Sequence, residues 1–235
     1  MSAADALASS RHAAAPTKTW FGLYPAVVAD VVDPDGLGRV KVRLPWSGDG
    51  AAGAYEAWAR VATLIAGPQH GSWFLPDVEA EVLVAFEGGD VTRPCVVGAL
   101  WSARQVPPMA MDPAGSNRVK TLRTRGGLSI TFDDQDAAER LTIETPGGQR
   151  LVLEDGPGSI QIRDSHGNAL LLEASGVTVQ SPATVTVQAS TVHVSASRVT
   201  VDAALATFSG TLKADAVITN SVVSASYTPG AGNIW

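Results

Sequence analysis

The sequence predicts an all-β protein in two parts, a small closed barrel followed by a narrow β-helical shaft. Short segments with strand alternation recur along the chain between tracts of turn residues. Near the C-terminal end the phrase Val-x-Val recurs every seven or eight residues, and a fixed short period is typical of a solenoid. The four copies of the phrase are Val177–Val179, Val185–Val187, Val192–Val194 and Val199–Val201.

A coiled coil is the alternative for this repeat, because seven is also the heptad period. A coiled coil places apolar residues three and four apart, with charges beside them. Here the apolar residues are two apart and are mostly β-branched, which favours a strand. Between residues 174 and 226 only Arg198, Asp202, Lys213 and Asp215 carry charge. The repeat therefore predicts β-structure.

Several copies of the chain are needed to bury this repeat. A short strand with one apolar side leaves that side open in a single chain. Three chains wound about one axis form a triangular prism that buries the valines and pairs every edge strand with a neighbour. The composition, 45% hydrophobic and 17% charged, agrees with extensive burial between subunits. We expect the trimer core to contain Val177, Val179, Val185, Val187, Val192, Val194, Val199 and Val201.

The front of the chain predicts a five-stranded barrel. Five of the six tryptophans fall within the first 101 residues, which indicates a compact core that contains aromatic residues. Five strands with a long middle connection suit a small closed barrel such as the OB-fold. The expected strands are Trp20–Val32, Arg39–Trp46, Ala57–Leu64, Glu79–Phe86 and Pro94–Trp101.

Composition shifts divide the chain into five segments. The Ala- and Ser-rich start reads as a disordered leader, and a Pro-bearing stretch reads as a linker. The last residues break the repeat. The predicted boundaries are leader 1–18, barrel 19–104, linker 105–117, shaft 118–226 and C-terminal tip 227–235.

Charge and composition exclude several classes of function. The net charge of −6 and the isoelectric point near 5.1 argue against nucleic acid as the partner. The basic stripe Arg39, Lys41 and Arg43 with Trp46 is the one feature that imitates a nucleic-acid surface. No apolar run is long enough to span a membrane, and the start lacks the pattern of a secretory signal, which predicts synthesis in the cytoplasm. The single cysteine, Cys95, predicts a buried thiol and no intrachain disulfide.

Two groups of residues and two single histidines resemble chemical sites and are better explained as turns or surface. Asp164–His166 contains the letters of a catalytic triad, but neighbours in a turn cannot converge on a substrate. Clustered carboxylates at residues 133–136 suggest calcium, yet the remaining ligands of a calcium loop are missing. His193 lies between two inward valines and is expected to point outward, and His70 is expected in a loop of the barrel. We expect no catalytic residue, no metal and no cofactor.

The barrel segments resemble the spike proteins of contractile injection machines, namely phage baseplate assembly protein V and the rear part of valine-glycine repeat protein G. The matching segments are Gly38–Trp46, Trp58–Ala62, Trp73–Val78, Glu81–Asp90 and Arg93–Trp101. The resemblance implies an OB-fold followed by an intertwined trimeric β-helix. It also implies a structural, non-enzymatic spike that caps the tube at the baseplate and is driven through the target envelope.

The same resemblance implies the partners. We expect a homotrimer that docks through its barrels to a separate hub protein and contacts the target membrane transiently. A bulky terminal Trp235 is costly to expose, so it either folds back to plug the shaft or helps form an apolar platform. We favour a platform formed by Tyr227, Pro229, Ile234 and Trp235, on which a PAAR-type tip protein would sit, and effector cargo is a further partner. The lysozyme-like insertion of some relatives and the His-x-His iron site of certain phage spikes are absent from this sequence.

Two other classes of function compete with the spike. A trimeric fibre that binds a receptor or glycan should carry exposed aromatic or polar loops along its shaft, and residues 174–226 offer almost none. An enzyme would need a convergent set of reactive side chains, which the turns do not supply. The sequence leaves open whether the particle is a phage tail, a secretion system or an extracellular injection machine.

Overall fold

The computed structural model describes residues 19–47 and 53–226, and within them the protein is all-β. No α-helix occurs in these residues, which confirms the predicted fold class. None of their helical segments has the length and apolarity to cross a membrane. The chain divides into two compact units, residues 1–183 and 184–235. The predicted leader and the predicted tip lie outside the described residues.

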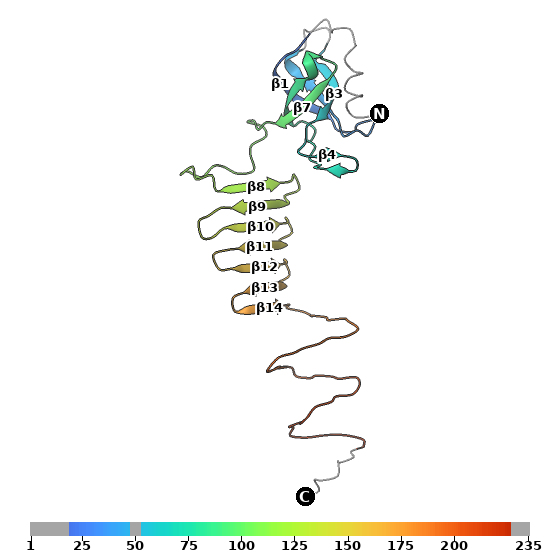
Figure 1. The fold of residues 1–235 in the computed structure, drawn as a ribbon, viewed down its shortest axis with the longest axis vertical. Helices are drawn as coiled ribbons and strands as arrows, with labels where there is room; N and C mark the ends of the chain where they lie inside the picture. The colour runs from blue at the N-terminus through green and yellow to red at the C-terminus, as the bar shows by residue number, and fades with distance from the viewer. Residues whose placement is uncertain (1–18, 48–52, 227–235) are drawn as a thin grey trace. The chain divides into compact units, whose positions relative to one another are not determined.

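The first unit begins with a closed five-stranded barrel (Figure 1). Its strands follow the order β1-β2-β3-β7-β6 and return to β1, with every neighbouring pair antiparallel except β3 and β7. All five predicted strands are present, with ends shifted by at most three residues. They are β1 (Leu23–Asp30), β2 (Val40–Leu44), β3 (Tyr55–Val61), β6 (Glu81–Phe86) and β7 (Pro94–Ala99).

The barrel core comes from strict alternation along the strands. In β2, Val40, Val42 and Leu44 are fully buried while the residues between them face outward. Burial of one such side chain contributes about 1.5–3 kcal/mol. Cys95 is half-buried rather than buried, because the alternation of β7 points its neighbours inward instead. The buried cluster comprises Ala26, Val28, Val40, Val42, Leu44, Ala59, Val82, Val84, Phe86 and Val96.

An aromatic cluster packs beside this core. Its neighbouring rings lie 5.1–5.8 Å apart between centroids, and the Trp46 indole N–H donates to the carbonyl of Pro25 at 2.9 Å. Burial raises the pKa of Tyr55 to about 12. Trp73 and Trp101 do not join this cluster and are about 70% exposed. The cluster consists of Trp20, Tyr24, Trp46, Tyr55 and Phe86.

Asp33 organises the turn between β1 and β2. Its buried carboxylate accepts hydrogen bonds from the backbone N–H groups of Asp35, Leu37 and Arg39 at 2.9–3.1 Å. The Arg39 guanidinium lies 2.6 Å from the same carboxylate and holds the pKa of Asp33 well below its ordinary value. Gly36 closes the turn with φ of 64°, a conformation that favours glycine.

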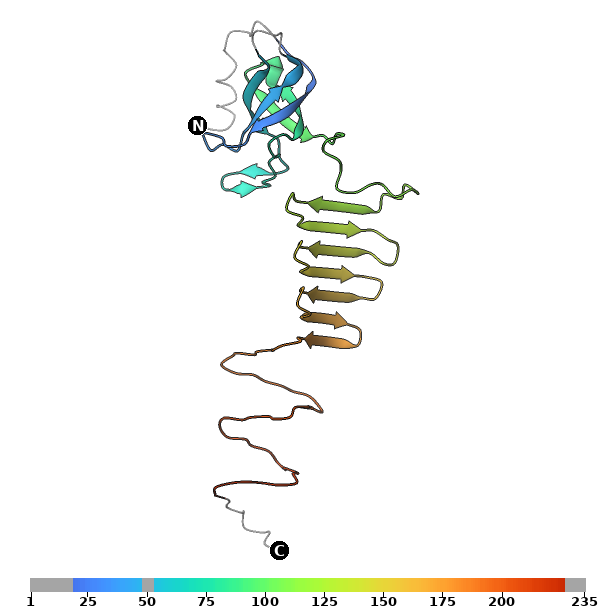
Figure 2. The same ribbon diagram turned by 180° about the vertical axis from the view of Figure 1, so that it is seen from behind.

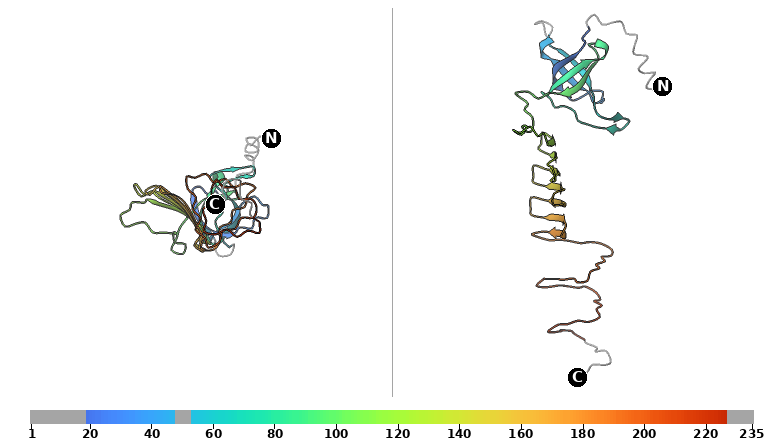
Figure 3. Two further views of the ribbon diagram at one scale, coloured as in Figure 1. Left: turned by 90° about the horizontal axis from the view of Figure 1, so that it is seen from below. Right: turned by 60° about the vertical axis from the view of Figure 1, so that its left-hand side comes forward.

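A seven-stranded antiparallel sheet follows the barrel within the first unit (Figure 2). Each strand pairs with its neighbours in sequence, so the sheet is a simple meander, and viewed from the side its strands lie in one layer (Figure 3). A separate two-stranded hairpin, β4 (Ala66–Gly67) and β5 (His70–Gly71), contains the exposed His70. The sheet strands are β8 (Val119–Arg123), β9 (Ser129–Asp133), β10 (Arg140–Glu144), β11 (Arg150–Glu154), β12 (Ser159–Arg163), β13 (Ala169–Glu173) and β14 (Gly176–Gln180).

The second unit contains no strand between residues 184 and 226, and every residue there is exposed. No backbone-to-backbone hydrogen bond is found within that stretch. The predicted shaft, residues 118–226, thus has two structurally different parts. Its first part pairs with itself as a meander, and the part that holds the later Val-x-Val phrases has no pairing partner among the described residues of its own chain.

Substitution of Asp33 should weaken the barrel in a pH-dependent way. A lowered pKa in the folded state means that this stabilisation is complete above the ordinary Asp pKa of about 4 and is lost as the pH falls through the folded value. Asp33→Asn should therefore lower the melting temperature at neutral pH, and its difference from the parent should shrink below about pH 4. Tryptophan fluorescence can follow melting. Asp35→Asn, at an exposed carboxylate, is the control with a smaller effect. A difference that stays constant down to about pH 2 would contradict this role.

Candidate assembly surface

Two columns of apolar side chains run down one face of the seven-stranded sheet. Residues opposite each other in an antiparallel pair share a face, as do residues two apart in one strand. The strand register therefore aligns one column from Lys120 through Phe132, Leu141, Leu153, Ile160 and Leu172 to Val177. The second column runs from Leu122 through Ile130, Ile143, Leu151, Ile162 and Leu170 to Val179. We call these two rows the apolar columns; Lys120 is their one polar member.

The opposite face of the sheet is largely polar. The Thr121 and Thr131 hydroxyls lie 3.0 Å apart on this face, and Arg140 forms an ion pair with Glu154 across the neighbouring strands. The central row on this face is Thr121, Thr131, Thr142, Val152, Gln161, Leu171 and Thr178. The sheet is therefore amphipathic, with one face suited to water.

In the single chain, side chains on the apolar face are exposed, whereas some on the polar face are buried. Phe132, Ile162 and Val177 in the apolar columns are 46%, 48% and 68% exposed. On the polar face Val152 and Ser159 are buried. Since contiguous apolar surface of this kind is rare on monomers, the apolar columns mark an interface.

The predicted core valines lie partly in the sheet and partly in the segment beyond residue 184. Val177 and Val179 lie in β14 and end the apolar columns. The other six predicted valines lie beyond residue 184, and each is more than half exposed in the single chain. His193 is exposed as well, together with the valines on both sides, so the single chain does not separate an inner from an outer face there.

Sequence reasoning missed the larger part of this surface. Its trimer core began at Val177, whereas the apolar columns begin in β8. The signal was present, because each strand from β9 to β13 carries the same apolar-x-apolar phrase as the valine repeat, for example Leu141-Thr-Ile143 and Ile160-Gln-Ile162. The prediction placed these strands in the shaft, residues 118–226, without naming their apolar residues as part of the trimer core.

The residues that resembled a catalytic triad form a turn. The Asp164 carboxylate accepts hydrogen bonds from the backbone N–H groups of His166 and Asn168 at 2.9 and 2.8 Å, and from the Asn168 side chain at 2.7 Å. The Asn168 side chain lowers the pKa of Asp164, and His166 is largely exposed. This arrangement fixes the predicted turn.

The other candidate sites are structural as well. Within the described residues no three His, Cys, Asp or Glu side chains gather as metal ligands, and Asp133 instead pairs with Arg118 at 3.2 Å. In the basic stripe, Arg39 is bound by Asp33, and Lys41 lies 3.4 Å from Glu56. These acidic neighbours offset two of the three positive charges of the stripe.

The four residues of the predicted tip platform, Tyr227, Pro229, Ile234 and Trp235, lie outside the described residues.

Comparison with protein families separates the same two parts. Residues 24–101 match the type VI secretion system/phage-baseplate injector OB domain. Residues 140–206 match the phage baseplate V C-terminal trimerisation domain, which includes most of the apolar columns and all eight predicted core valines. Together the two matches cover more than half of the chain.

Individual relatives are spike proteins of type VI secretion systems. The chain is 29% identical over 151 residues to the spike protein VgrG3 of Vibrio cholerae serotype O1, covering 60% of this chain and 15% of VgrG3. It is 32% identical over 129 residues to the spike protein VgrG1b of Pseudomonas aeruginosa, covering 52% of this chain and 17% of VgrG1b. The actin cross-linking toxin VgrG1 of Vibrio cholerae is 29% identical over 128 residues, which cover 50% of this chain and 12% of the toxin.

The barrel, the trimerisation match and these relatives define the class of protein. The chain belongs to the spike protein family of phage baseplates and type VI secretion systems. It spans less than a fifth of the length of each of these three relatives. The trimerisation match supports assembly as a homotrimer.

A carboxylate placed in the apolar columns should prevent assembly. Val179 and Thr178 are adjacent, exposed in the single chain, and on opposite faces of β14. Val179→Asp would bury an unpaired charge in each copy, at a cost of several kcal/mol, whereas Thr178→Asp would leave its charge in water. We expect light scattering to show loss of the oligomer for Val179→Asp alone. Equal masses for the two variants would contradict the assignment of the faces.

Proposed function

We propose that the chain is a homotrimeric, non-enzymatic spike of a contractile injection machine. The observation that carries this proposal is the continuity of the apolar columns with the Val-x-Val repeat. Three sheets that turn their apolar columns toward a common axis would form a triangular prism. The repeat beyond residue 184 would then be wound from all three chains, with the predicted valines inside.

Such a prism would be stiff along its axis, as a piercing spike has to be. The seven strands of one sheet, spaced about 4.8 Å apart, give this part of the shaft a length of about 29 Å. Bending it would break many ladder hydrogen bonds together. Three such sheets therefore support a rigid spike that is pushed through the target cell envelope when the machine contracts.

The partners follow from the two ends of this spike. A hub or baseplate protein would bind the barrels, and a PAAR-type tip protein would bind a platform made by Tyr227, Pro229, Ile234 and Trp235. Effector cargo would travel on the same assembly, and contact with the target membrane would be transient. The protein would be made in the bacterial cytoplasm and would act at the target envelope as part of the particle.

A receptor-binding fibre is the second candidate function, and no observation favours it. In residues 184–226 the only aromatic side chain described is Phe208. Glycan and receptor sites are usually built from exposed aromatic and polar loops. The repeat supplies small residues and valines instead.

The mass of the purified protein tests the spike assembly. Light scattering should give three times the chain mass of 24.3 kDa, and the species should resist heat and SDS because its edges are all paired. A stable monomer would rule out the proposed trimer and, with it, the spike.

Removal of residues 227–235 tests the tip platform. We expect the shortened chain to remain a trimer but to lose capture of a PAAR-type protein in a pull-down, because the bulky apolar platform is gone. Trp235→Ala alone should weaken capture, and His193→Ala serves as a control within the shaft. Undiminished capture by the shortened chain would place the tip-binding surface elsewhere.

A further inference from the structure

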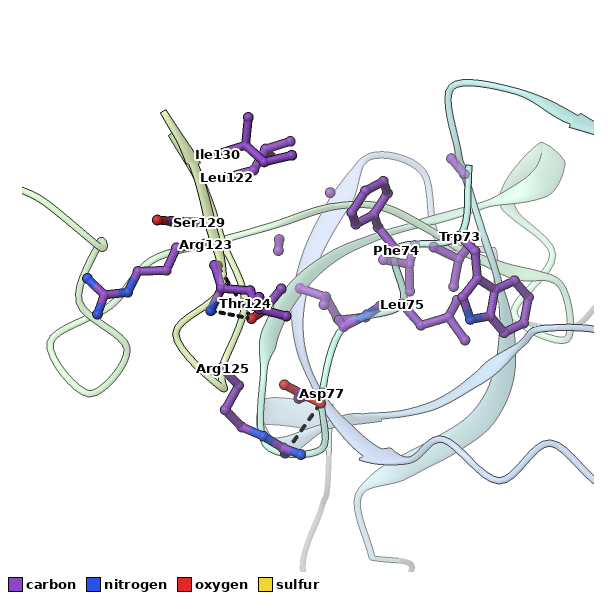
Figure 4. Close-up of a pocket in the computed structure, with 18 of the residues that line it drawn as sticks. Trp73, Phe74, Leu75, Asp77, Leu122, Arg123, Thr124, Arg125, Ser129 and Ile130 are labelled. Carbon is purple, nitrogen blue, oxygen red and sulfur yellow. Dashed lines mark hydrogen bonds and ion pairs between the residues drawn. The ribbon is translucent and has the colours of Figure 1, made fainter. Parts of the chain in front are cut away.

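A groove of about 850 Å³ opens between the barrel and the first strands of the sheet (Figure 4). On the barrel side it is lined by the loop Trp73–Pro76 together with Val82 and Val96. On the sheet side it is lined by Leu122, Leu128, Ile130 and Ile143. Both walls are therefore mainly apolar.

The loop that forms the barrel wall is poorly covered in the single chain. Trp73 and Phe74 are 73% and 74% exposed. Among the described residues outside the aromatic cluster, they are the two adjacent aromatic side chains that are most exposed in one loop. The indole of Trp73 rests on Gly38, where an added Cβ would lie 3.0 Å from the ring and where φ is +72°. One side of the indole thus packs against Gly38, and most of the ring surface remains exposed to solvent.

The loop does not close the groove onto its own sheet. The link between the two walls is an ion pair between Asp77 and Arg125 at 3.5 Å, and both side chains are mostly exposed. Exposed pairs of this kind contribute at most about 1 kcal/mol. Burial of two aromatic side chains would contribute considerably more, so an additional apolar partner is favoured.

The sheet wall of the groove belongs to the apolar columns. Leu122, Ile130 and Ile143 are consecutive members of the second column, and Ile143 lies inside the match to the trimerisation domain. The groove is therefore continuous with the trimer interface. In an assembly with three-fold symmetry, equivalent residues of the three chains lie at the same height along the axis. The residues that cover the sheet wall of the groove therefore come from β8 and β9 of a second copy.

We propose that the loop Trp73–Pro76 is a clamp in which the barrel of one copy holds the β8–β9 hairpin of the neighbouring copy. The clamp rests on the homotrimer proposed above. Leu128 of the neighbour enters the groove between Phe74 and the apolar columns. The barrel is then part of the trimer interface, and its orientation relative to the shaft is set by a neighbouring chain.

Disulfide trapping in the full chain tests this clamp. In a Cys95→Ser background, Phe74→Cys combined with Leu128→Cys should join copies on oxidation, so that denaturing gels show mostly dimers and trimers of the chain. Leu64→Cys combined with Leu128→Cys is the matched control, because Leu64 is 94% exposed and does not line the groove. The control pair should remain at the mass of one chain.

The other outcomes separate the clamp from the spike itself. A protein that is trimeric before denaturation but runs as a single chain after oxidation overturns the clamp and leaves the trimer standing. A protein that is monomeric before denaturation overturns both. Trp73→Ala supplies a second readout: it should lower the temperature at which the SDS-resistant trimer dissociates by several degrees, whereas Trp101→Ala, equally exposed but outside the groove, should not. Equal shifts for the two tryptophans also count against the clamp.

Discussion

The structure depends on the burial of one apolar face that a single chain cannot cover. From β9 to β14 every strand directs two apolar side chains to the same side, and the sheet is only one layer thick. A layer of this kind is stable only when something packs on it, because apolar burial is the main favourable contribution to folding. The repeat in residues 184–226 needs partner chains even more, because within these described residues it forms neither a strand nor a backbone-to-backbone hydrogen bond.

The barrel satisfies the same requirement within one chain. Its sheet closes on itself, so the inward-facing valines of its core and Leu44 are buried and no edge strand is left open. A self-sufficient head joined to a shaft that folds by association suits a protein of an injection spike. In the proposed spike the head would present a fixed surface to the rest of the machine, while the shaft would gain stiffness from the three chains that share it.

Much of the fold could be predicted from the sequence, and the assembly surface only in part. Alternation around Val40, Val42 and Leu44 identified a barrel strand, and the Val-x-Val phrase pointed to several chains. The columns from β8 to β13 were missed, because only the register shows that Ile130, Ile143 and Leu151 form one row. The exposure of Trp73 was also missed, since tryptophan in a small barrel is usually core, and its position depends on a distant contact with Gly38.

Amide hydrogen exchange of the intact protein measures the central claim most directly. Within the part of one chain that the structure describes, residues 184–226 make no backbone ladder, so we attribute any slow exchange there to hydrogen bonds with other chains. The account predicts strong protection across this stretch in the assembled protein, comparable with that of β8–β14. Exchange at the rate of an unstructured peptide, in a protein whose sheet remains protected, would contradict it.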